Sequence, residues 1–361
     1  MGFIRSHLIS NNPYQVEIGQ QVNTVTSYAD HSNIYGSTSK TMKKVRSFNG
    51  GRLKTNLRNI LPTENGNYFS GDDHVNQSPF IAIWHSLFLR NHNNLADKLA
   101  VINTHWDGNQ VFNEARKINI AIYQKIIYDE WLPLFLGEKI AQKFENVSYD
   151  ENVDASTTSE FSSAAFRYMH SFINSEFELL NNEGRKIKVN VSDAISNPKL
   201  LESSFDEVLL GLMVQKINLL GYSEEILNKL FKKDNGVGMD LLGIDIMRGR
   251  DHGVKPYTKY REFCNLKPDV KTFSDLYPHI PKSAIIQLRQ TYKSVHDIDL
   301  LVGGALESIN GTEDDSSFFG PTLQCIIYKQ FYRLKSGDSY FYSHAGNLNE
   351  GDWIYKINLE N

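Results

Sequence analysis

Apolar residues recur at helical spacing in several long stretches of the chain. The clearest stretch begins at Pro79 and repeats apolar side chains every three or four positions, at Phe80, Ile83, Trp84, Leu87, Phe88, Leu95 and Leu99. Proline is favoured at the first position of a helix, so this pattern predicts a long helix that starts at Pro79. A second pattern predicts a helix over residues 113–132 that Pro133 ends.

The same periodicity predicts further helices in the second half of the chain, over residues 156–173, 205–215, 224–232, 282–295 and 321–335. Residues 11–37 read as a loop with one short helix, and residues 48–78 read as a long connecting region. No period-two pattern typical of strands stands out, and no internal repeat is visible. The pattern favours one mainly helical domain with long ordered loops, which often carry function or bind ions.

Composition narrows the class of protein. The 361 residues are 40% hydrophobic and 22% charged, which is the range of a globular chain with ample core. The net charge of -4 offers no basic excess for nucleic acid, and no apolar run is long enough to predict a membrane span. The first residues also lack the apolar stretch of a signal peptide.

The cysteines and the glycosylation motifs point in different directions. The chain has only two cysteines, Cys264 and Cys325, and this count alone favours two free thiols. Asn-X-Ser/Thr motifs, which favour secretion, occur at Asn76, Asn146, Asn190 and Asn310.

One polar loop has the donors of a calcium site. In "TSYADHS" an oxygen-bearing side chain stands at every second position, at Thr26, Tyr28, Asp30 and Ser32. Calcium takes six to eight oxygen ligands, so the alternation suits it. The spacing is not that of an EF-hand, and for this segment alone an ordinary polar turn is the more common explanation.

Histidines in apolar helices raise the question of a metal. His170 stands alone in "FRYMHSFI", with Arg167 three residues earlier on the same face. A flat cofactor whose iron binds the imidazole would explain this pair, but a buried structural histidine is the ordinary alternative. His85 and His92 lie seven residues apart, about 10 Å along a helix, which is too far to share one metal. We therefore expect them to be hydrogen-bonded structural residues.

The segment "MRGRDHG", residues 247–253, is dense in charge. It is either a surface cluster or a buried network in which Arg248 and Arg250 bind an anion, with Asp251 and His252 fixing them.

Taken together, these segments resemble the animal haem peroxidase family. The matching stretches run in family order from about residue 20 to 342: "NTVTSYADHSNIYGS", "GGRLKTN", "GDDHVNQSPFIAIWHSLFLRNHNNLA", "WDGNQVFNEARKINIAIYQKIIYDEWLPLFLG", "FSSAAFRYMHSFI", "DLLGIDIMRGRDHGVKPYTKYREFCNL", "DIDLLVGGALE" and "GPTLQCIIYKQFYRLKSGDSYFY". The resemblance implies the mainly α fold of that family, with haem b and calcium as cofactors.

The resemblance also implies roles for matched residues. His170 is the expected proximal ligand of the haem iron, and Asp245 stands where the family usually has an asparagine that accepts a hydrogen bond from this imidazole. Arg167 and Arg248 match arginines near the haem propionates. Thr26, Tyr28, Asp30 and Ser32 match the calcium loop, with Tyr28 giving its backbone carbonyl. Cys264 and Cys325 match a disulfide of the family, which implies an oxidising compartment.

The chain departs from the family on the distal side of the haem. His74 replaces the catalytic arginine, Gln77 replaces a glutamate that forms an ester with haem, and Asn91 replaces another glutamate. The family's distal histidine and one calcium ligand lie upstream of residue 20. We therefore expect residues 1–361 to form a single partial peroxidase domain, truncated at the N-terminus and also at the C-terminus, with residues 1–20 as a remnant before the calcium loop.

The implied activity is reduction of hydrogen peroxide with oxidation of halide or of phenolic donors such as tyrosine, in a secreted protein that responds to oxidative stress. An alternative is a haem-binding scaffold with impaired catalysis, because the distal histidine is absent from these residues and because His74 and Gln77 replace the family's arginine and glutamate. A third is a helical binding protein without haem, which would leave Arg167, His170, Asp245 and Arg248 without a shared purpose.

Overall fold

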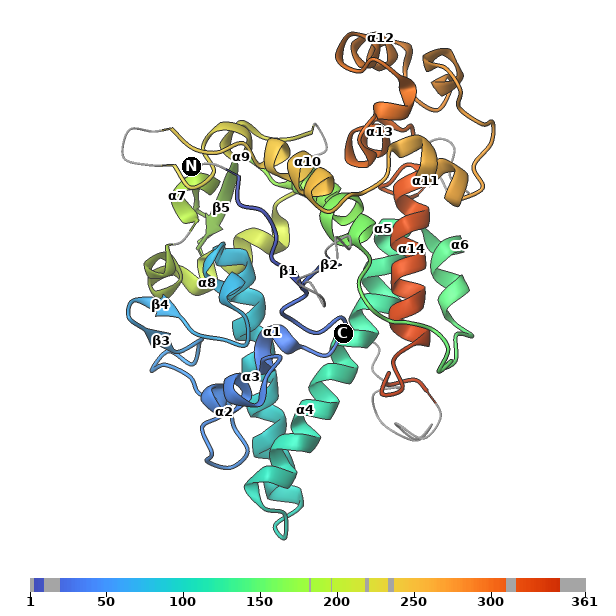
Figure 1. Cartoon of the computed structure of the whole chain (residues 1–361). Coiled ribbons are helices and arrows are strands. Elements are labelled where there is room, and N and C mark those ends of the chain that lie inside the picture. The colour runs from blue at the N-terminus through green and yellow to red at the C-terminus, as the bar shows by residue number, and fades with distance from the viewer. Residues whose placement is uncertain are drawn as a thin grey trace. The chain divides into compact units, whose positions relative to one another are not determined.

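The computed structural model describes residues 3–9, 20–181, 183–195, 197–217, 221–232, 237–309 and 316–344. Helices dominate these residues (Figure 1), as the sequence predicts. The chain divides into two compact units. Among the described residues, unit 1 comprises those within 1–23, 125–170 and 241–344, and unit 2 comprises those within 24–124 and 171–240. The single domain that we expect over residues 1–361 remains a prediction.

The two longest helices of unit 2 lie side by side (Figure 1). Helix α3 spans Pro79–Ile102, and Ser78 caps its N-terminus by accepting a hydrogen bond from the Phe80 N–H. The prediction of a helix from Pro79 is thus confirmed. Helix α4 spans Gly108–Lys125. Buried Leu95 and Ala96 of α3 pack against Val111 and Ala115 of α4 and form one core of this unit.

The predicted ends of the second helix are wrong. α4 begins five residues before Asn113, at Gly108, and a π-helix, Ile126–Trp131, and helix α5, Leu132–Leu136, follow it. Pro133 lies in the first turn of α5, where its missing N–H costs nothing, so it does not stop the helix. Gly137, with a φ of 89°, ends the run instead.

Short antiparallel hairpins, which the sequence pattern did not predict, complete unit 2. β3, Thr63–Glu64, and β4, Asn67–Tyr68, enclose an Asn-Gly turn, which is typical of tight hairpins. β5, Glu176–Leu180, pairs with β6, Lys186–Asn190, and buries alternate residues Phe177 and Leu179. Helix α8, Pro198–Val214, packs on β5 so closely that a Cβ on Gly211 would overlap the Glu178 carbonyl. This five-residue alternation was too short to stand out in the sequence.

The other elements of unit 2 are short. Helix α8 begins seven residues before the predicted start at 205, and α9 ends four residues before the predicted end at 232. The short elements are α1 (Ser32–Tyr35), α2 (Ser39–Val45), the 3-10 helix η1 (Asp73–Asn76), α7 (Val191–Ala194) and α9 (Glu224–Asn228).

Helix α14, Pro321–Ser336, confirms the helix predicted over residues 321–335 (Figure 1). It contacts the π-helix η4 (Phe161–Ala165) and helix α13 (Leu300–Leu306). The other described elements of unit 1 are β1 (Leu8–Ile9), β2 (Gln20–Gln21), α6 (Glu138–Ala141), η3 (Gln142–Phe144), α10 (Leu241–Asp251), α11 (Tyr257–Phe263), η6 (Phe273–Leu276), α12 (Lys282–Thr291) and η7 (Val295–Asp297). Tyr257, Leu276, Ile280, Leu288 and Ile298 form a buried core between α11 and α12. Helix α12 ends four residues before the predicted end at 295.

The segment that carries His170 is helical but is not an α-helix. Phe161–Ala165 is a π-helix, η4, and Phe166–Phe172 is a 3-10 helix, η5. The hydroxyls of Ser162 and Ser163 donate to the carbonyls of Thr158 and Ser159, four residues earlier. Such bonds compete with the backbone ladder and bend helices. In a 3-10 helix, residues three apart are eclipsed, so Arg167 and His170 project from the same face.

Candidate functional site

A buried carboxylate joins the two candidate residues of η5. Asp245 lies on α10 with its side chain 0% exposed, and it is the buried residue of that helix. Its Oδ1 accepts a hydrogen bond of 2.8 Å from Nη1 of Arg167, and its Oδ2 lies 2.6 Å from Nδ1 of His170. The structure therefore brings Arg167, His170 and Asp245 together in unit 1, although 75 residues separate the histidine from the aspartate.

This arrangement leaves one nitrogen of His170 available. A carboxylate accepts hydrogen bonds, so Nδ1 carries the proton that His170 donates to Asp245. Among the described residues, Asp245 is the hydrogen-bond partner of the ring, and the side chain is 32% exposed. A histidine held through one nitrogen by a carboxylate is the usual arrangement of a metal-binding imidazole. The residues present thus fit a haem iron bound at Nε2.

Arg248 belongs to a neighbouring cluster centred on Asp251. Nη1 of Arg248 donates to Oγ of Ser6 at 2.9 Å and lies 3.3 Å from Oδ2 of Asp251. The backbone N–H of Ser6 and Nε of Arg5 also donate to Asp251, at 2.7 and 2.6 Å. These donors, with the Ser6 N–H first, hold the pKa of Asp251 below its usual range. The anion of this network is therefore the protein's own carboxylate.

His252 completes the Asp251 cluster. Its Nε2 lies 2.7 Å from Oγ of Ser6, and burial together with nearby Arg248 lowers its pKa. The contacts of Arg5 and Ser6 with Asp251 were not predicted from the sequence. Nothing in "FIRS" marks these residues as partners of a helix more than 200 positions later. The contacts link the segment before the calcium loop to α10.

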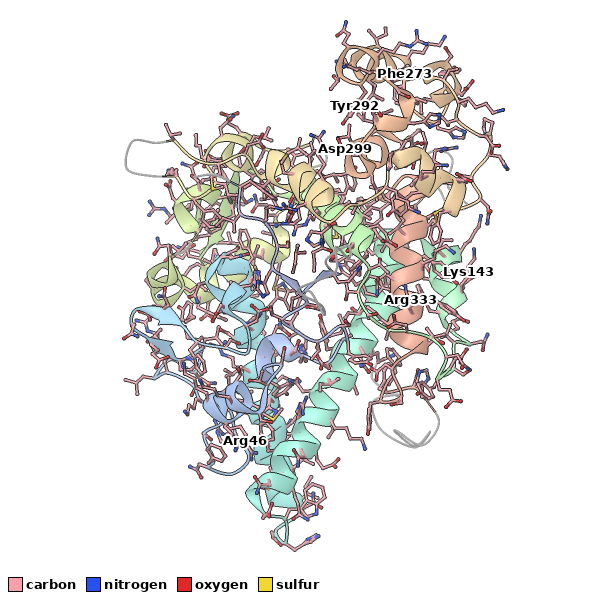
Figure 2. All side chains as sticks on the ribbon, viewed as in Figure 1. Arg46, Lys143, Phe273, Tyr292, Asp299 and Arg333 are labelled. Carbon is pink, nitrogen blue, oxygen red and sulfur yellow. A yellow bond between two sulfur atoms is a disulfide. The ribbon has the colours of Figure 1, made fainter. Side chains whose placement is uncertain are left out.

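Arg250 does not contribute to the anion network that we considered. Its Nε and Nη2 donate to the two carboxylate oxygens of Asp299, at 2.9 and 2.7 Å. The Tyr292 hydroxyl donates to the same carboxylate at 2.8 Å, and Figure 2 labels both Asp299 and Tyr292. Burial, followed by the hydrogen bond to Asp299, raises the pKa of Tyr292 to about 12. Arg250 thus fixes α10 to the start of α13.

The candidate calcium loop, in unit 2, brings together three of its four side chains. The Thr26 hydroxyl lies 2.8 Å from Oδ1 of Asp30 and 3.0 Å from the Ser32 hydroxyl. The Ser32 N–H also donates to Asp30 Oδ1, at 3.0 Å. The ring of Tyr28 is exposed, as expected if only its carbonyl takes part. These hard oxygen donors fit a calcium ion, to which the Tyr28 carbonyl would add a further oxygen.

His31 anchors this loop, which the sequence did not indicate. Its backbone is left-handed, with a φ of 56°, and its ring stacks on Tyr123 at 4.0 Å between ring centroids. The ring also packs against Phe88 of α3. Burial lowers the pKa of His31 to about 3, so it stays neutral at physiological pH. The neighbouring Asp30 and Ser32 are therefore held in place from within the core of unit 2.

His74 and Gln77, the departures from the family pattern, lie at the surface of unit 2. His74 is on η1 with its side chain 65% exposed, and its Nδ1 lies 2.6 Å from Oδ1 of Asp72. That hydrogen bond holds the pKa of Asp72 below its usual range. Gln77 is exposed and donates its backbone N–H to the His74 carbonyl at 2.9 Å. The catalytic role considered for His74 stays a prediction.

His85 and His92 are buried, hydrogen-bonded histidines, as expected. Nδ1 of His85 lies 3.1 Å from Oγ of Ser70, and Nε2 lies 3.0 Å from Nδ2 of Asn33. His92 bonds to the Tyr35 hydroxyl and to the Gly51 carbonyl, both at 3.0 Å. Burial lowers the pKa of each to about 4.

Cys264 and Cys325 form a disulfide of 2.04 Å that joins the end of α11 to α14. The pairing implied by the family resemblance is confirmed, and the free thiols favoured by the cysteine count are wrong. Two cysteines 61 residues apart carry no sequence signal of their proximity, so the count alone was a poor guide.

The whole chain, residues 1–361, matches the family model described as animal haem peroxidase. The chain belongs to the animal haem peroxidase family. Family membership implies haem as the cofactor, and the predicted mainly α fold of this family is confirmed.

Three relatives illustrate the family likeness. "Peroxidase" of Drosophila melanogaster is 36% identical over 94% of this chain and 53% of its own length. "Chorion peroxidase" of the same organism is 32% identical over 97% of this chain and 46% of its own length. The solved structure of peroxidase A from Dictyostelium discoideum superposes with a TM-score of 0.82 and 32% identity, over 91% of this chain and 66% of that one. The chain thus spans about half the length of these two curated relatives.

Two further features of this member of the family concern membrane spans and the glycosylation motifs. Within the described ranges, no helix is long and apolar enough to cross a membrane. Asn146 and Asn190 of the glycosylation motifs are exposed, whereas both side-chain atoms of Asn76 bond to the backbone of Tyr68. Asn310 lies outside the described residues.

Proposed function

We propose that this chain binds haem b through His170 and carries the proximal half of a site that reduces hydrogen peroxide. The observation that supports this most is the carboxylate of Asp245, fully buried and bonded to Nδ1 of His170. Burial of a charge is costly unless it is paired, and among the described residues this one is paired with Arg167 and His170, the two residues that we expect beside the cofactor. A purely structural histidine would not need it.

Each residue of the site has a specific task in this proposal. His170 would hold the iron at Nε2, while Asp245 fixes the ring orientation and its tautomer through Nδ1. Arg248 and Arg167 would pair with the two propionates. When bound, haem supplies the redox chemistry by which peroxide is reduced and a halide or phenolic donor is oxidised. We assign this reaction, including the choice of electron donor, to the full-length protein.

Haem titration tests the proposal directly. Purified protein titrated with haem should develop a Soret band in a one-to-one ratio, and His170→Ala should abolish it. His105→Ala, which removes an exposed histidine elsewhere, is the matched control and should bind haem normally. Equal Soret bands for the two variants would contradict the assignment of His170.

We further propose that Thr26, Asp30 and Ser32 bind one calcium ion together with the carbonyl of Tyr28. The Thr26 hydroxyl already lies within hydrogen-bond distance of the Asp30 and Ser32 side chains, and the Ser32 backbone N–H donates to Asp30. Calorimetric titration with calcium should show one site that Asp30→Asn removes. Asp269→Asn, which changes an exposed aspartate of unit 1, should leave calcium binding unchanged.

An impaired haem-binding protein is the second candidate, because His74 and Gln77 stand at positions that carry catalytic residues in the family pattern. The exposed ring of His74, held by Asp72, favours this reading. We expect little or no oxidation of guaiacol by hydrogen peroxide with this haem-loaded chain, and no further loss in His74→Ala. Rapid turnover that depends on His74 would instead make it catalytic on the distal side.

We also propose that the protein is secreted. Its disulfide is typical of an oxidising compartment, and exposed Asn146 and Asn190 stand in glycosylation motifs. Expression in a secretory host should attach glycans at these two sites, and mass spectrometry of the glycopeptides would detect them.

A further inference from the structure

We propose that Arg167 limits the negative charge that Asp245 passes to His170, and so sets the reduction potential of the bound iron. This inference rests on the proposed haem binding by His170. It assigns Arg167 a task on the axial ligand, in addition to the pairing with a propionate considered above.

Each carboxylate oxygen of Asp245 accepts a hydrogen bond from a different partner. Oδ1 of Asp245 accepts from Nη1 of Arg167 at 2.8 Å, and Oδ2 accepts from Nδ1 of His170 at 2.6 Å. Arg167 is fixed from its other side, because its Nε donates to the Ser162 carbonyl at 3.0 Å. Asp245 is fully buried, so water does not share its charge.

The consequence follows from electrostatics in a medium of low polarity. A carboxylate facing an imidazole alone would draw the Nδ1 proton towards itself and leave the ring more electron-donating, which favours oxidised iron. A guanidinium on the other oxygen takes up part of that charge and weakens the pull. Arg167 is thus a positioning residue that offsets the effect of having an aspartate where the family usually has an asparagine.

Arg248 provides a matched control. It is also an arginine of this site and is similarly exposed, with 20% of its side chain accessible against 29% for Arg167. Its guanidinium contacts Ser6 and Asp251 and makes no bond to Asp245 among the described residues. Removing Arg248 changes the net charge near the haem by the same amount but leaves the Asp245 pair intact.

A double-mutant cycle on the haem-loaded protein separates these effects. Arg167→Gln should shift the ferric–ferrous equilibrium about tenfold towards ferric, a fall in midpoint potential of about 59 mV. In an Asp245→Asn background the same change should have a much smaller effect. Arg248→Gln should shift the potential equally in both backgrounds. Equal shifts for Arg167→Gln in both backgrounds would overturn the inference.

A haem-free measurement keeps the test independent of the proposed function. The proton between His170 and Asp245 should give a downfield NMR resonance in the apoprotein that Asp245→Asn abolishes. Arg167→Gln should move it further downfield, and Arg167→Lys should restore most of the original position. An unmoved resonance would overturn the inference even if haem binds, whereas absence of haem binding alone would contradict only the proposed function. Circular dichroism of each variant checks that it folds.

Discussion

His170 of unit 1 and His92 of unit 2 are both histidines of a helical segment, and they differ in what their second ring nitrogen contacts. Both nitrogens of His92 are used, by the Tyr35 hydroxyl and the Gly51 carbonyl, and the residue is 0% exposed. His170 has one nitrogen on a buried carboxylate and the other free of described protein partners. The difference teaches that the second nitrogen, and not burial in a helix, distinguishes a candidate ligand from a core histidine.

His74 adds a limit to this comparison. It also bonds to a carboxylate through Nδ1, yet its ring lies at the surface and Asp72 is only partly buried. A surface pair of this kind exchanges readily with water and contributes little free energy. A histidine–carboxylate pair therefore indicates a site only when the carboxylate is removed from solvent, as Asp245 is.

The largest expected effect is on the free energy of unfolding, which should fall much more when His92 is replaced than when His170 is. His92→Ala should lower the free energy of unfolding by about 3 kcal/mol, because it empties a packed position and leaves the Tyr35 hydroxyl and Gly51 carbonyl unsatisfied. His170→Gln should cost less than about 1 kcal/mol, because its position is partly open to water. Urea unfolding of both variants measures this, and similar losses would break the comparison.

The second-largest expected effect is a loss of stability in acid, caused by the buried histidines. The pKa of His92 is about 4 in the folded chain against an ordinary 6.5. The unfolded chain therefore takes up a proton as the pH falls below 6.5, and the folded chain does so only near 4. Stability should thus fall across this window, by about 3 kcal/mol for a shift of this size.

His92→Gln, which does not titrate, is the control for the acid effect. The slope of unfolding free energy against pH between 6.5 and 4 should become shallower in this variant. An unchanged slope would show that His92 is not neutral and buried as described. His85, with a pKa of about 4, supplies a second instance of the same effect.

The smallest expected effect concerns the surface pair. His74→Ala should change the free energy of unfolding by no more than about 0.5 kcal/mol. It should, however, raise the pKa of Asp72, since the hydrogen bond from His74 is the largest cause of its low value. NMR titration of the Asp72 carboxyl carbon measures this. A large loss of stability would place His74 in a more demanding role than its exposure suggests.

The sequence predicted much of the helical framework, for clear physical reasons. α3 and α14 carry a long apolar period and start at a proline; the start of α3 was predicted at Pro79, and both ends of α14 were predicted to within one residue. The helix of His170 was found but not its π and 3-10 form, because serine hydroxyls that bond to the backbone leave no mark in the apolar period. The hairpin β5–β6 was missed because only two of its residues alternate clearly into the core.

Some contacts of the candidate site were expected before the structure, and others were not. The pairing of His170 with Asp245 was expected only through the family resemblance, since 75 residues separate them. The bond from Arg167 to Asp245 was not expected, because spacing shows which residues share a helix face and not which partner they reach across the fold. Arg5 and Ser6 were missed for the same reason.

The bond between Cys264 and Cys325 has a consequence for how this protein would survive a protease. A single cut between these residues, for example beside α12 or α13, would leave both pieces covalently attached. Such a nicked chain would migrate as one species on a gel until a reductant separated it. Helix α10, which carries Asp245 and Arg248, lies before Cys264. A cut between Cys264 and Cys325 would therefore leave this helix of the proposed haem site intact.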